Sequence, residues 1–414
     1  MSRYAVTGSS GKPHGRSRGR PPGRAGQGRT GLGALCAVVL LWGTAVVLAP
    51  AAGAGPGSFI GGLPTRTTIA STVPANGDVN PYGVAIVGRS TGRLTRGSVL
   101  VSNFNDVTNA QGTGTTIVEV SPSGHVSLFA RIDGAHLPGA CPGGVGLTTA
   151  LAVLQSGWVV VGSLPTTDGT AATTKAGCLL VLDSSGRVVE TWAGGLINGP
   201  WDLAAIDHGD HAVLFVSNVL NGTVAAGGAV VHRGTVIRIT VDLDRGRLPR
   251  PTSTVAIGTG FAERTDPAAL VVGPTGLAVG QTGTVYVADT ANSRLAAIPD
   301  GTDRSSPVPH GGFTVSSGGL LNSPLGLAMA PNGHLLSVNG GDGLLVETTP
   351  GGTQVDSRML DSSGSPPGAG ALFGLAVAHA GHGEDHADHG EDHAHSHDGL
   401  WFVDDADNTL NLQH

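Results

Sequence analysis

The residues best suited to chemistry are histidines gathered in one short stretch, which reads HAGHGEDHADHGEDHAHSH over residues 379–397. Neutral imidazole is the commonest protein ligand for Zn²⁺, Ni²⁺ and Cu²⁺. Seven imidazoles in so few residues can reach one ion without a preset geometry. This stretch, the histidine tract, therefore predicts metal capture. Its histidines are His379, His382, His386, His389, His393, His395 and His397.

The histidine tract contains no apolar residue large enough to pack, so it is predicted to be a disordered insertion over residues 379–398 when metal-free. It has no fixed four-ligand spacing, which favours a buffering or capture loop over a catalytic centre. In composition it resembles the His-rich loops of zinc transporters. The alternative is a solvated insertion whose affinity for metal is incidental.

A second set of oxygen-bearing side chains follows a series of apolar runs, each placed where a strand is expected to end. Carboxylate and amide oxygens are the ligands of Ca²⁺. If the runs surround a channel, these residues could hold a ligand or Ca²⁺ at its mouth. The alternative is that each caps the turn after its own strand. The set, called the Asn/Asp row, is Asn103, Asn218, Asp289, Asn339 and Asp404.

The first 54 residues are predicted to be a secretory signal rather than part of the fold. Residues 1–30 are basic and contain no acidic residue, residues 31–49 are apolar and uncharged, and Ala52-Gly53-Ala54 forms a small-residue cleavage site. The alternative is an uncleaved membrane anchor, because the apolar stretch is nearly long enough to cross a bilayer. The folded part of the chain would be secreted, or displayed outside the membrane if the signal is retained.

Export leaves two cysteines, Cys141 and Cys178, in an oxidising compartment. Two thiols in such an environment predict one disulfide, the alternative being two unpaired buried thiols.

The charge of the remainder argues against some partners. The seven bases before residue 54 account for part of the 23 Lys and Arg, which leaves 16 against 30 Asp and Glu. A surface this acidic disfavours nucleic acid, and anionic membranes unless the signal remains as an anchor. The 68 glycines and 25 prolines are interleaved with Val, Leu and Ile runs, which favours short strands joined by many turns.

A Pro-x-Gly-apolar-Ala phrase recurs about every 50 residues, a period typical of propeller blades. Clean copies begin at Pro81, Pro274 and Pro324; degenerate copies are Pro200-Trp201-Asp202-Leu203-Ala204 and residues 372–376, and residues 146–152 fill the remaining gap. Each phrase opens a unit in which a second, a third and usually a fourth strand can be recognised. Six antiparallel units predict an all-β, six-bladed β-propeller over residues 55–414.

The last unit lacks a fourth strand, while residues 66–70 form a spare strand before the first unit. We expect this N-terminal strand to complete the last blade, closing the ring and covering an exposed edge. Long connections between second and third strands in units 1 to 3 (103–115, 163–177 and 218–234) should build a wall over half of the channel mouth.

Residues 285–295, VYVADTANSRL, resemble the NHL repeat, whose usual phrase is close to VYVADTGNNRI, and Pro274 to Gly280 resemble its opening. The match is strong in the fourth unit, fair in the fifth and weak in the second. NHL propellers usually have six blades, in agreement with the count. The family includes scaffolds, binding modules, lyases and lactonase-like relatives, so the resemblance implies a fold rather than one function.

Two functions remain open. The first is an exported binding or scaffold protein that takes a small molecule, a protein or a cell-wall ligand, with divalent metal captured by the histidine tract. The second is an extracellular, divalent-metal-dependent hydrolase or lyase of the lactonase-like propeller type, with its site at the channel mouth. Lactonase-like relatives usually open with a metal-binding Glu, and Pro81-Tyr82-Gly83 has no Glu nearby. No catalytic residues are recognisable, since the serine hydrolase, zincin and P-loop phrases do not occur.

Overall fold

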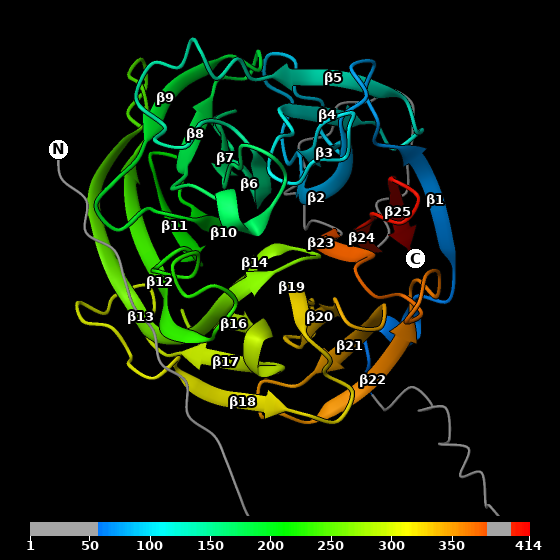
Figure 1. The fold of residues 1–414 in the computed structure, drawn as a ribbon. Coiled ribbons are helices and arrows are strands. Elements are labelled where there is room, and N and C mark those ends of the chain that lie inside the picture. The colour runs from blue at the N-terminus through cyan, green and yellow to red at the C-terminus, as the bar shows by residue number, and fades with distance from the viewer. Residues whose placement is uncertain (1–56, 379–398) are drawn as a thin grey trace, which may run out of the picture. The chain divides into compact units, whose positions relative to one another are not determined.

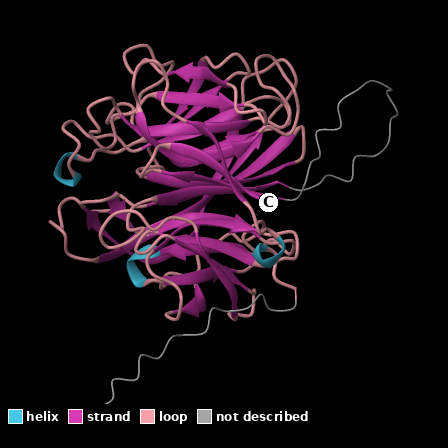
Figure 2. Ribbon diagram, turned by 90° about the vertical axis from the view of Figure 1, so that its right-hand side faces the viewer, coloured by secondary structure: helices cyan, strands magenta, loops and turns pink. Residues whose placement is uncertain are grey.

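The computed structural model describes residues 57–378 and 399–414. The chain divides into two compact units, residues 1–49 and 50–414, and every described residue belongs to the second. In that unit six sheets stand as blades around a central axis (Figure 1), which confirms the predicted all-β, six-bladed propeller. Figure 2 shows the unit from the side, with only short helical turns among the strands. None of the described helices is long and apolar enough to span a membrane.

Each blade is an antiparallel sheet that extends outward from an inner strand near the axis. Blade 1 consists of β2 (Val79–Ile86), β3 (Val99–Asn105), β4 (Thr116–Val120) and β5 (Val126–Arg131). Blade 2 consists of β6 (Leu147–Val153), β7 (Val159–Ser163), β8 (Cys178–Leu182) and β9 (Val188–Trp192). Blade 3 consists of β10 (Pro200–Asp207), β11 (His211–Asn218), β12 (Val231–Asp242), β13 (Arg250–Asp266) and β14 (Leu270–Val272).

The second half of the ring follows the same order. Blade 4 consists of β15 (Pro274–Val279), β16 (Val285–Asp289), β17 (Arg294–Ile298) and β18 (Phe313–Ser317). Blade 5 consists of β19 (Pro324–Met329), β20 (Leu335–Asn339), β21 (Leu344–Thr348) and β22 (Gln354–Met359). Blade 6 consists of β23 (Leu372–Ala378), β24 (Gly399–Asp404), β25 (Thr409–Gln413) and β1 (Arg66–Ser71). The short 3₁₀ turns among the described residues are η1 (Ile60–Gly62), η2 (Ala171–Thr173) and η3 (Thr290–Asn292).

The N-terminal strand closes the ring as the sequence predicts. β1 pairs antiparallel with β25, and Thr65 and His414 exchange two backbone hydrogen bonds of 2.8 Å at the end of the ladder. Arg66 also forms an ion pair of 3.0 Å with the buried carboxylate of Asp404. The start and end of the described unit therefore share one sheet, whose outer edge is formed by β1.

The glycine of the recurring phrase lets neighbouring inner strands touch backbone to backbone. A Cβ atom on Gly326 would lie 2.0 Å from the carbonyl oxygen of Phe373, and one on Gly374 would lie 2.0 Å from that of Tyr82. No side chain fits such a contact, because real Cβ atoms do not approach carbonyl oxygens so closely. The phrase is thus a packing signal for the middle of the ring.

Blade 3 departs from the four strands expected in each unit. Its outer strand β13 runs for 17 residues, and after a tight turn β14 pairs back along Arg264–Asp266. The apolar run of β14 is buried, which explains why it leaves the edge of its blade. The sequence did not predict this hairpin because the run is only three residues long and adjoins the next phrase at Pro274.

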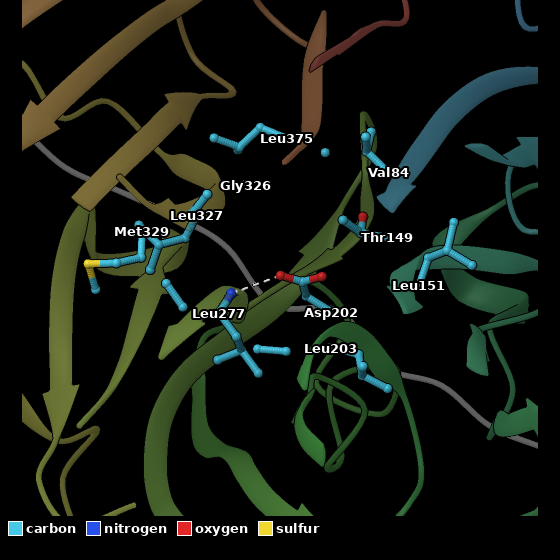
Figure 3. Close-up of a pocket in the computed structure, with 14 residues that line it drawn as sticks. Val84, Thr149, Leu151, Asp202, Leu203, Leu277, Gly326, Leu327, Met329 and Leu375 are labelled. Atoms are coloured by element: carbon cyan, nitrogen blue, oxygen red, sulfur yellow. Dashed lines mark hydrogen bonds between the residues drawn. The ribbon is translucent and has the colours of Figure 1, made fainter. Parts of the chain in front are cut away.

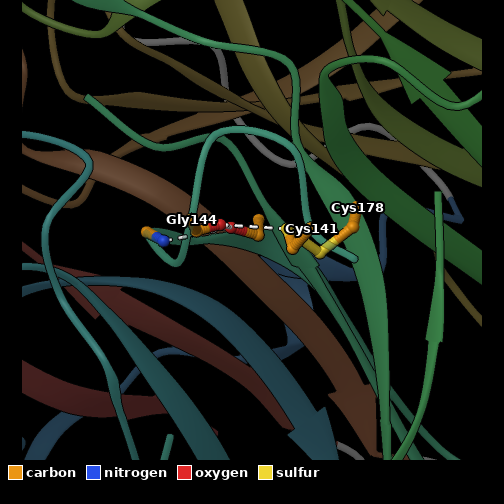
Figure 4. Close-up of a disulfide and its surroundings, with 5 residues drawn as sticks. Cys141, Gly144 and Cys178 are labelled. Carbon is orange, nitrogen blue, oxygen red and sulfur yellow. Dashed lines mark hydrogen bonds between the residues drawn. A yellow bond between two sulfur atoms is a disulfide. The ribbon is translucent and has the colours of Figure 1, made fainter. Parts of the chain in front are cut away.

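A disulfide joins Cys141, in the connection between β5 and β6, to Cys178, the first residue of β8 (Figure 4). It ties the passage from blade 1 to blade 2 onto the third strand of blade 2. Closing a loop of this separation, 37 residues, contributes about 4 kcal/mol in the chain-entropy account.

Candidate functional site

The channel along the ring axis differs at its two ends. The upper end is the face on which the inner strands begin, and the lower end is the face on which they finish. At the upper end, buried apolar side chains from several blades form one cluster, called the plug. Its members are Tyr82, Phe104, Leu164, Trp201, Val219, Ala269, Leu270, Val271, Val272, Leu325 and Phe373.

The plug combines the second residue of the phrase with the unexpected hairpin. Tyr82 lies between two rings, with centroids 3.9 Å from Phe373 and 4.3 Å from Phe104, both in stacked geometry. β14 crosses the upper face toward blade 6 (Figure 1). The tip of its hairpin is held by blade 1, where Gln111 Nε2 donates to the Pro267 carbonyl at 2.8 Å. Stacked and fully buried aromatic rings make this end a structural core.

The long connections of blades 1 to 3 contribute to the plug instead of standing around an open mouth. Phe104, Leu164 and Val219, near the start of each connection, all belong to it. The wall expected from the sequence is therefore packed down over the axis together with β14.

The Asn/Asp row lies at the upper end, on the second strand of every blade except blade 2. Each member pairs across the ladder with the first residue of the phrase, so the row and the phrase openings lie on the same face of the ring. The inner strand separates each row residue from the axis by one strand spacing, about 5 Å. All five side chains are buried.

The hydrogen bonds of the row fasten loops and strand ends. Asp289 pairs with Arg294 of its own blade at 2.7 Å, and Asn339 Nδ2 donates to the Leu320 carbonyl at 2.7 Å. Asn218 Oδ1 accepts from the Asn198 amide at 3.1 Å. The Asp289 contact lies at the turn after its own strand, as the turn-capping interpretation expects, whereas the Asn339 and Asn218 contacts fasten the connections that precede the inner strands of their blades. A ligand or Ca²⁺ shared by the row remains a prediction, and within residues 57–378 and 399–414 no group of three or more His, Cys, Asp or Glu is arranged to hold a metal.

A second polar group, called the rim cluster, lies where blade 6 meets blade 1 and consists of Asn80, Tyr82, Asn105 and Asp405. With its amide nitrogen toward Asp405, Asn80 donates to that carboxylate at 2.7 Å and accepts from Asn105 Nδ2 at 3.0 Å. Burial, and then repulsion from Asp404, raises the pKa of Asp405 to about 7. The Tyr82 hydroxyl and Asn105 Oδ1 are buried without a partner among the described residues.

Below the plug, the channel contains a cavity of about 180 Å³, bounded by all six inner strands (Figure 3). The apolar residue of every phrase faces it, and so do the phrase glycines of blades 5 and 6. The lining residues are Val84, Thr149, Leu151, Asp202, Leu203, Ala204, Leu277, Ala278, Gly326, Leu327, Ala328, Met329, Gly374 and Leu375. Exposure rises toward the lower end, where Ala204, Ala328 and Met329 are only partly buried.

Asp202 is the one ionisable side chain among these lining residues, and it stands where the phrase of blades 1, 4, 5 and 6 has glycine. Its carboxylate bridges to the next inner strand, accepting a hydrogen bond of 2.8 Å from the Leu277 amide. Burial raises the pKa of Asp202 to about 7, although the amides of Leu277 and Leu203 oppose that rise. Desolvation thus dominates, and no cationic group of the described residues compensates the charge.

Thr149 supplies a second polar group to the cavity. It is buried, and its hydroxyl has no hydrogen-bond partner among the described residues. Buried polar groups are usually satisfied, so an unsatisfied hydroxyl in the lining of the cavity that also contains Asp202 is available to a ligand.

Sequence reasoning missed Asp202 and Thr149 as site residues. The available signal was a departure from the repeat: in Pro200-Trp201-Asp202-Leu203-Ala204 a carboxylate replaces the glycine that the packing requires elsewhere. Such a replacement predicts local space around the inner strand, and the structure contains that space as the cavity.

The histidine tract lies outside the described residues. The strands before and after it, β23 and β24, pair in blade 6, and β23 ends and β24 begins at the lower end of the ring. The predicted signal, residues 1–54, also lies outside the described residues.

Comparison with known proteins supports the fold. The family model of the NHL repeat matches residues 272–298, which contain β15, β16 and β17. The predicted resemblance to NHL repeats is confirmed on these residues. No curated protein sequence matches the chain significantly.

Among solved structures, the chain is similar to a luciferin-regenerating enzyme, with 12% identity and a TM-score of 0.48 over 84% of this chain and 94% of that one. It is also similar to a gluconolactonase from Xanthomonas campestris, with 13% identity and a TM-score of 0.47 over 84% and 88% of the two chains. A catalytically inactive virginiamycin B lyase from Staphylococcus aureus gives 13% identity and a TM-score of 0.45 over 84% and 98%. At these identities and TM-scores, nothing known of the three proteins is carried over to this chain.

Proposed function

We propose that this NHL-type β-propeller is an exported binding protein that holds a small molecule in its central cavity, from the lower end of the channel. Export is supported by the signal-like first 54 residues and is compatible with the disulfide between Cys141 and Cys178. In this proposal the plug is structural and the cavity is the working site.

The observation that carries the proposal is the Asp202 carboxylate inside a cavity whose other lining side chains, apart from Thr149, are apolar. A buried, uncompensated carboxylate costs stability, because its charged form is poorly solvated. Such a group is retained most readily where a ligand completes its interactions. Concave, mostly apolar pockets with a few convergent polar groups are the usual form of small-molecule sites.

Methionine methyl groups provide a direct test, because the chain contains only three methionines. Met329 lines the cavity, whereas Met359 lies half-exposed on the outer strand of blade 5. We would label the methionine methyls with ¹³C and add small molecules of positive, neutral and negative charge. The proposal predicts that at least one charge class shifts the Met329 signal while Met359 stays in place. If no class moves Met329, the cavity is not a binding site.

The histidine tract adds a proposed metal-binding function to this protein. Its seven imidazoles are suited to Zn²⁺, Ni²⁺ or Cu²⁺. Calorimetric titration with Zn²⁺ should give tight binding for the intact protein and loss of that binding after deletion of residues 379–397. Equal binding by both proteins would remove this part of the proposal.

A second candidate function is the divalent-metal-dependent hydrolase or lyase, and the rim cluster is the observation in its favour. Among the described residues, the partly buried Asp405 has no basic partner, and the Tyr82 hydroxyl and Asn105 Oδ1 are unpartnered. Oxygen ligands of this type suit Ca²⁺. Ca²⁺ should then raise the Tm of the intact protein and have no such effect on Asp405→Asn. A Tm that does not respond to Ca²⁺ in either protein would exclude the candidate.

A further inference from the structure

The central cavity presents two polar side chains, Asp202 and Thr149, among apolar ones. Figure 3 shows the Asp202 carboxylate and the Thr149 hydroxyl at the cavity, with leucine side chains and Met329 around them. The Leu277 amide satisfies one carboxylate oxygen at 2.8 Å. Among the described residues that line the cavity, none is Lys, Arg or His.

We propose that the ligand of the cavity is a small primary amine in its ammonium form, carrying an apolar body about the size of one ring. This inference rests on the proposed binding function and specifies its ligand class. The ammonium group lies against Asp202 and donates a second hydrogen bond to Thr149. The apolar body contacts the leucine side chains and Met329.

Charge argues for a cation at this position. Asp202 is 8% exposed, and its hydrogen-bond donors are uncharged backbone amides. An ammonium ion supplies the opposite charge and up to three donors, and a hydrogen bond between charged groups is about twice as strong as a neutral one. A carboxylate or phosphate ligand would instead repel Asp202. The raised pKa of Asp202 supports the same conclusion, because it reflects desolvation without a nearby cation.

Oxygen count argues against a bare divalent ion. Ca²⁺ takes six to eight oxygen ligands, whereas only two side chains that line this cavity carry oxygen, Asp202 and Thr149. Apolar side chains dominate the remainder, and they favour a carbon skeleton over a hydrated ion.

Size limits the apolar body. The cavity holds about 180 Å³, and an engineered apolar cavity of roughly 150 Å³ accepts benzene. One six-membered ring with a short aminomethyl arm is therefore close to the largest compact ligand that fits without rearrangement. Longer amines could extend toward the lower end, where Ala204 and Met329 are partly exposed.

The test uses three probes that share one ring and differ in charge: benzylamine, benzyl alcohol and benzoate. Binding to the full propeller would be measured by calorimetry, with the ¹³C-methyl signal of Met329 reporting the location and that of Met359 serving as the internal control. We expect benzylamine to bind at least tenfold more tightly than benzyl alcohol and to shift Met329 alone. Benzoate should not bind.

Asp202→Asn keeps the shape and the acceptor for the Leu277 amide but removes the charge. It should reduce benzylamine affinity at least tenfold and leave that of benzyl alcohol within about twofold. The matched control is Asp244→Asn, which removes one exposed carboxylate at the turn after β12 and should change neither affinity. Thr149→Val, which removes the hydroxyl at nearly constant volume, should weaken benzylamine by a smaller factor.

The outcomes separate the two levels of the proposal. If none of the three probes shifts Met329, the binding function of the cavity fails with them. If benzyl alcohol binds as tightly as benzylamine, or Asp202→Asn leaves benzylamine affinity unchanged, the cavity binds a ligand but the amine inference is overturned. Benzylamine binding that is weakened equally by Asp244→Asn would also overturn it, because the preference would then reflect net charge alone.

Discussion

The two ends of the channel are built from the same recurring phrase and have opposite properties. At the upper end, the second residue of the phrase is large in four blades, and Tyr82, Trp201, Leu325 and Phe373 pack into the plug. Two residues further along the inner strands, the fourth residue of the phrase lines a cavity of about 180 Å³. The upper end is a packed core, and the level below it encloses a cavity.

The difference shows how a repeat can encode both stability and a site. Side chains at the plug level meet each other and β14, so burial is complete. At the cavity level the phrase glycines draw inner strands together, but Asp202 replaces glycine in blade 3 and adds a charge. A functional site is expected where a residue differs from the repeated phrase, because a substitution that weakens packing is retained most readily when it serves a function.

Truncating the plug should produce the largest effect. Phe373→Ala removes a ring that is 1% exposed and stacked on Tyr82, and it should lower the free energy of unfolding by about 3–5 kcal/mol. Met329→Ala, at the lower end, should cost less than about 1.5 kcal/mol because this side chain is only partly buried. Chemical denaturation measures the free energy of unfolding of both variants. Equal losses would contradict the distinction between the packed plug and the cavity.

Disturbing the level between plug and cavity should be nearly as damaging. Gly326→Ala places a Cβ atom 2.0 Å from the Phe373 carbonyl oxygen, so the inner strands of blades 5 and 6 must separate. We expect a loss of about 3 kcal/mol, at the upper end of overpacking effects. Gly351→Ala is the control, since the nearest atom to its Cβ would be 3.7 Å away. A fully stable Gly326→Ala protein would show that the inner strands are not in tight contact.

The pH dependence of stability should reveal the charge of Asp202 in the central cavity. The pKa of Asp202 is raised from 3.8 to about 7 in the folded protein, so the folded state binds more protons than the unfolded state between these values. Stability conferred at this site is therefore present at pH 4 and lost as the pH rises to about 7. Compared with Asp202→Asn, the native protein should lose about 2–4 kcal/mol across this range. Parallel pH profiles of the two proteins would contradict a buried, uncompensated carboxylate.

The Asn/Asp row should show the smallest effect. Asn339→Ala removes the hydrogen bonds to the Leu320 carbonyl and to Asp342, which should cost about 1 kcal/mol. Because the row lies one strand away from the axis, benzylamine binding should not change. A variant that keeps its stability but loses ligand affinity would assign the row to a binding site instead of to turns.

Much of the fold could be predicted from the sequence because the phrase repeats. The spacing of Pro81, Pro274 and Pro324, together with the stray strand at residues 66–70, led to six blades closed by β1. The positions of the row were also predictable, since antiparallel strands return to the face on which they began. The β14 hairpin was not predictable, because three apolar residues beside a phrase do not show that a strand leaves its blade to cover the axis.

The site was harder to predict than the fold. Asp202 was visible only as an imperfect copy of the phrase, and Thr149 lies in the least regular unit. Whether such departures reflect drift or a site depends on the space around them, which emerges only when all six inner strands are assembled. The histidine tract has the opposite character: its proposed metal binding rests on composition alone, and its position in space is not needed to predict it.

The most direct test of the account is the titration of the Asp202 carboxyl group, followed by ¹³C NMR and assigned by its loss in Asp202→Asn. The account predicts a pKa near 7 in the free protein, and a fall toward the ordinary carboxyl range when benzylamine saturates the cavity. A pKa near 4 in the free protein that benzylamine leaves unchanged would contradict both the buried charge and its proposed partner.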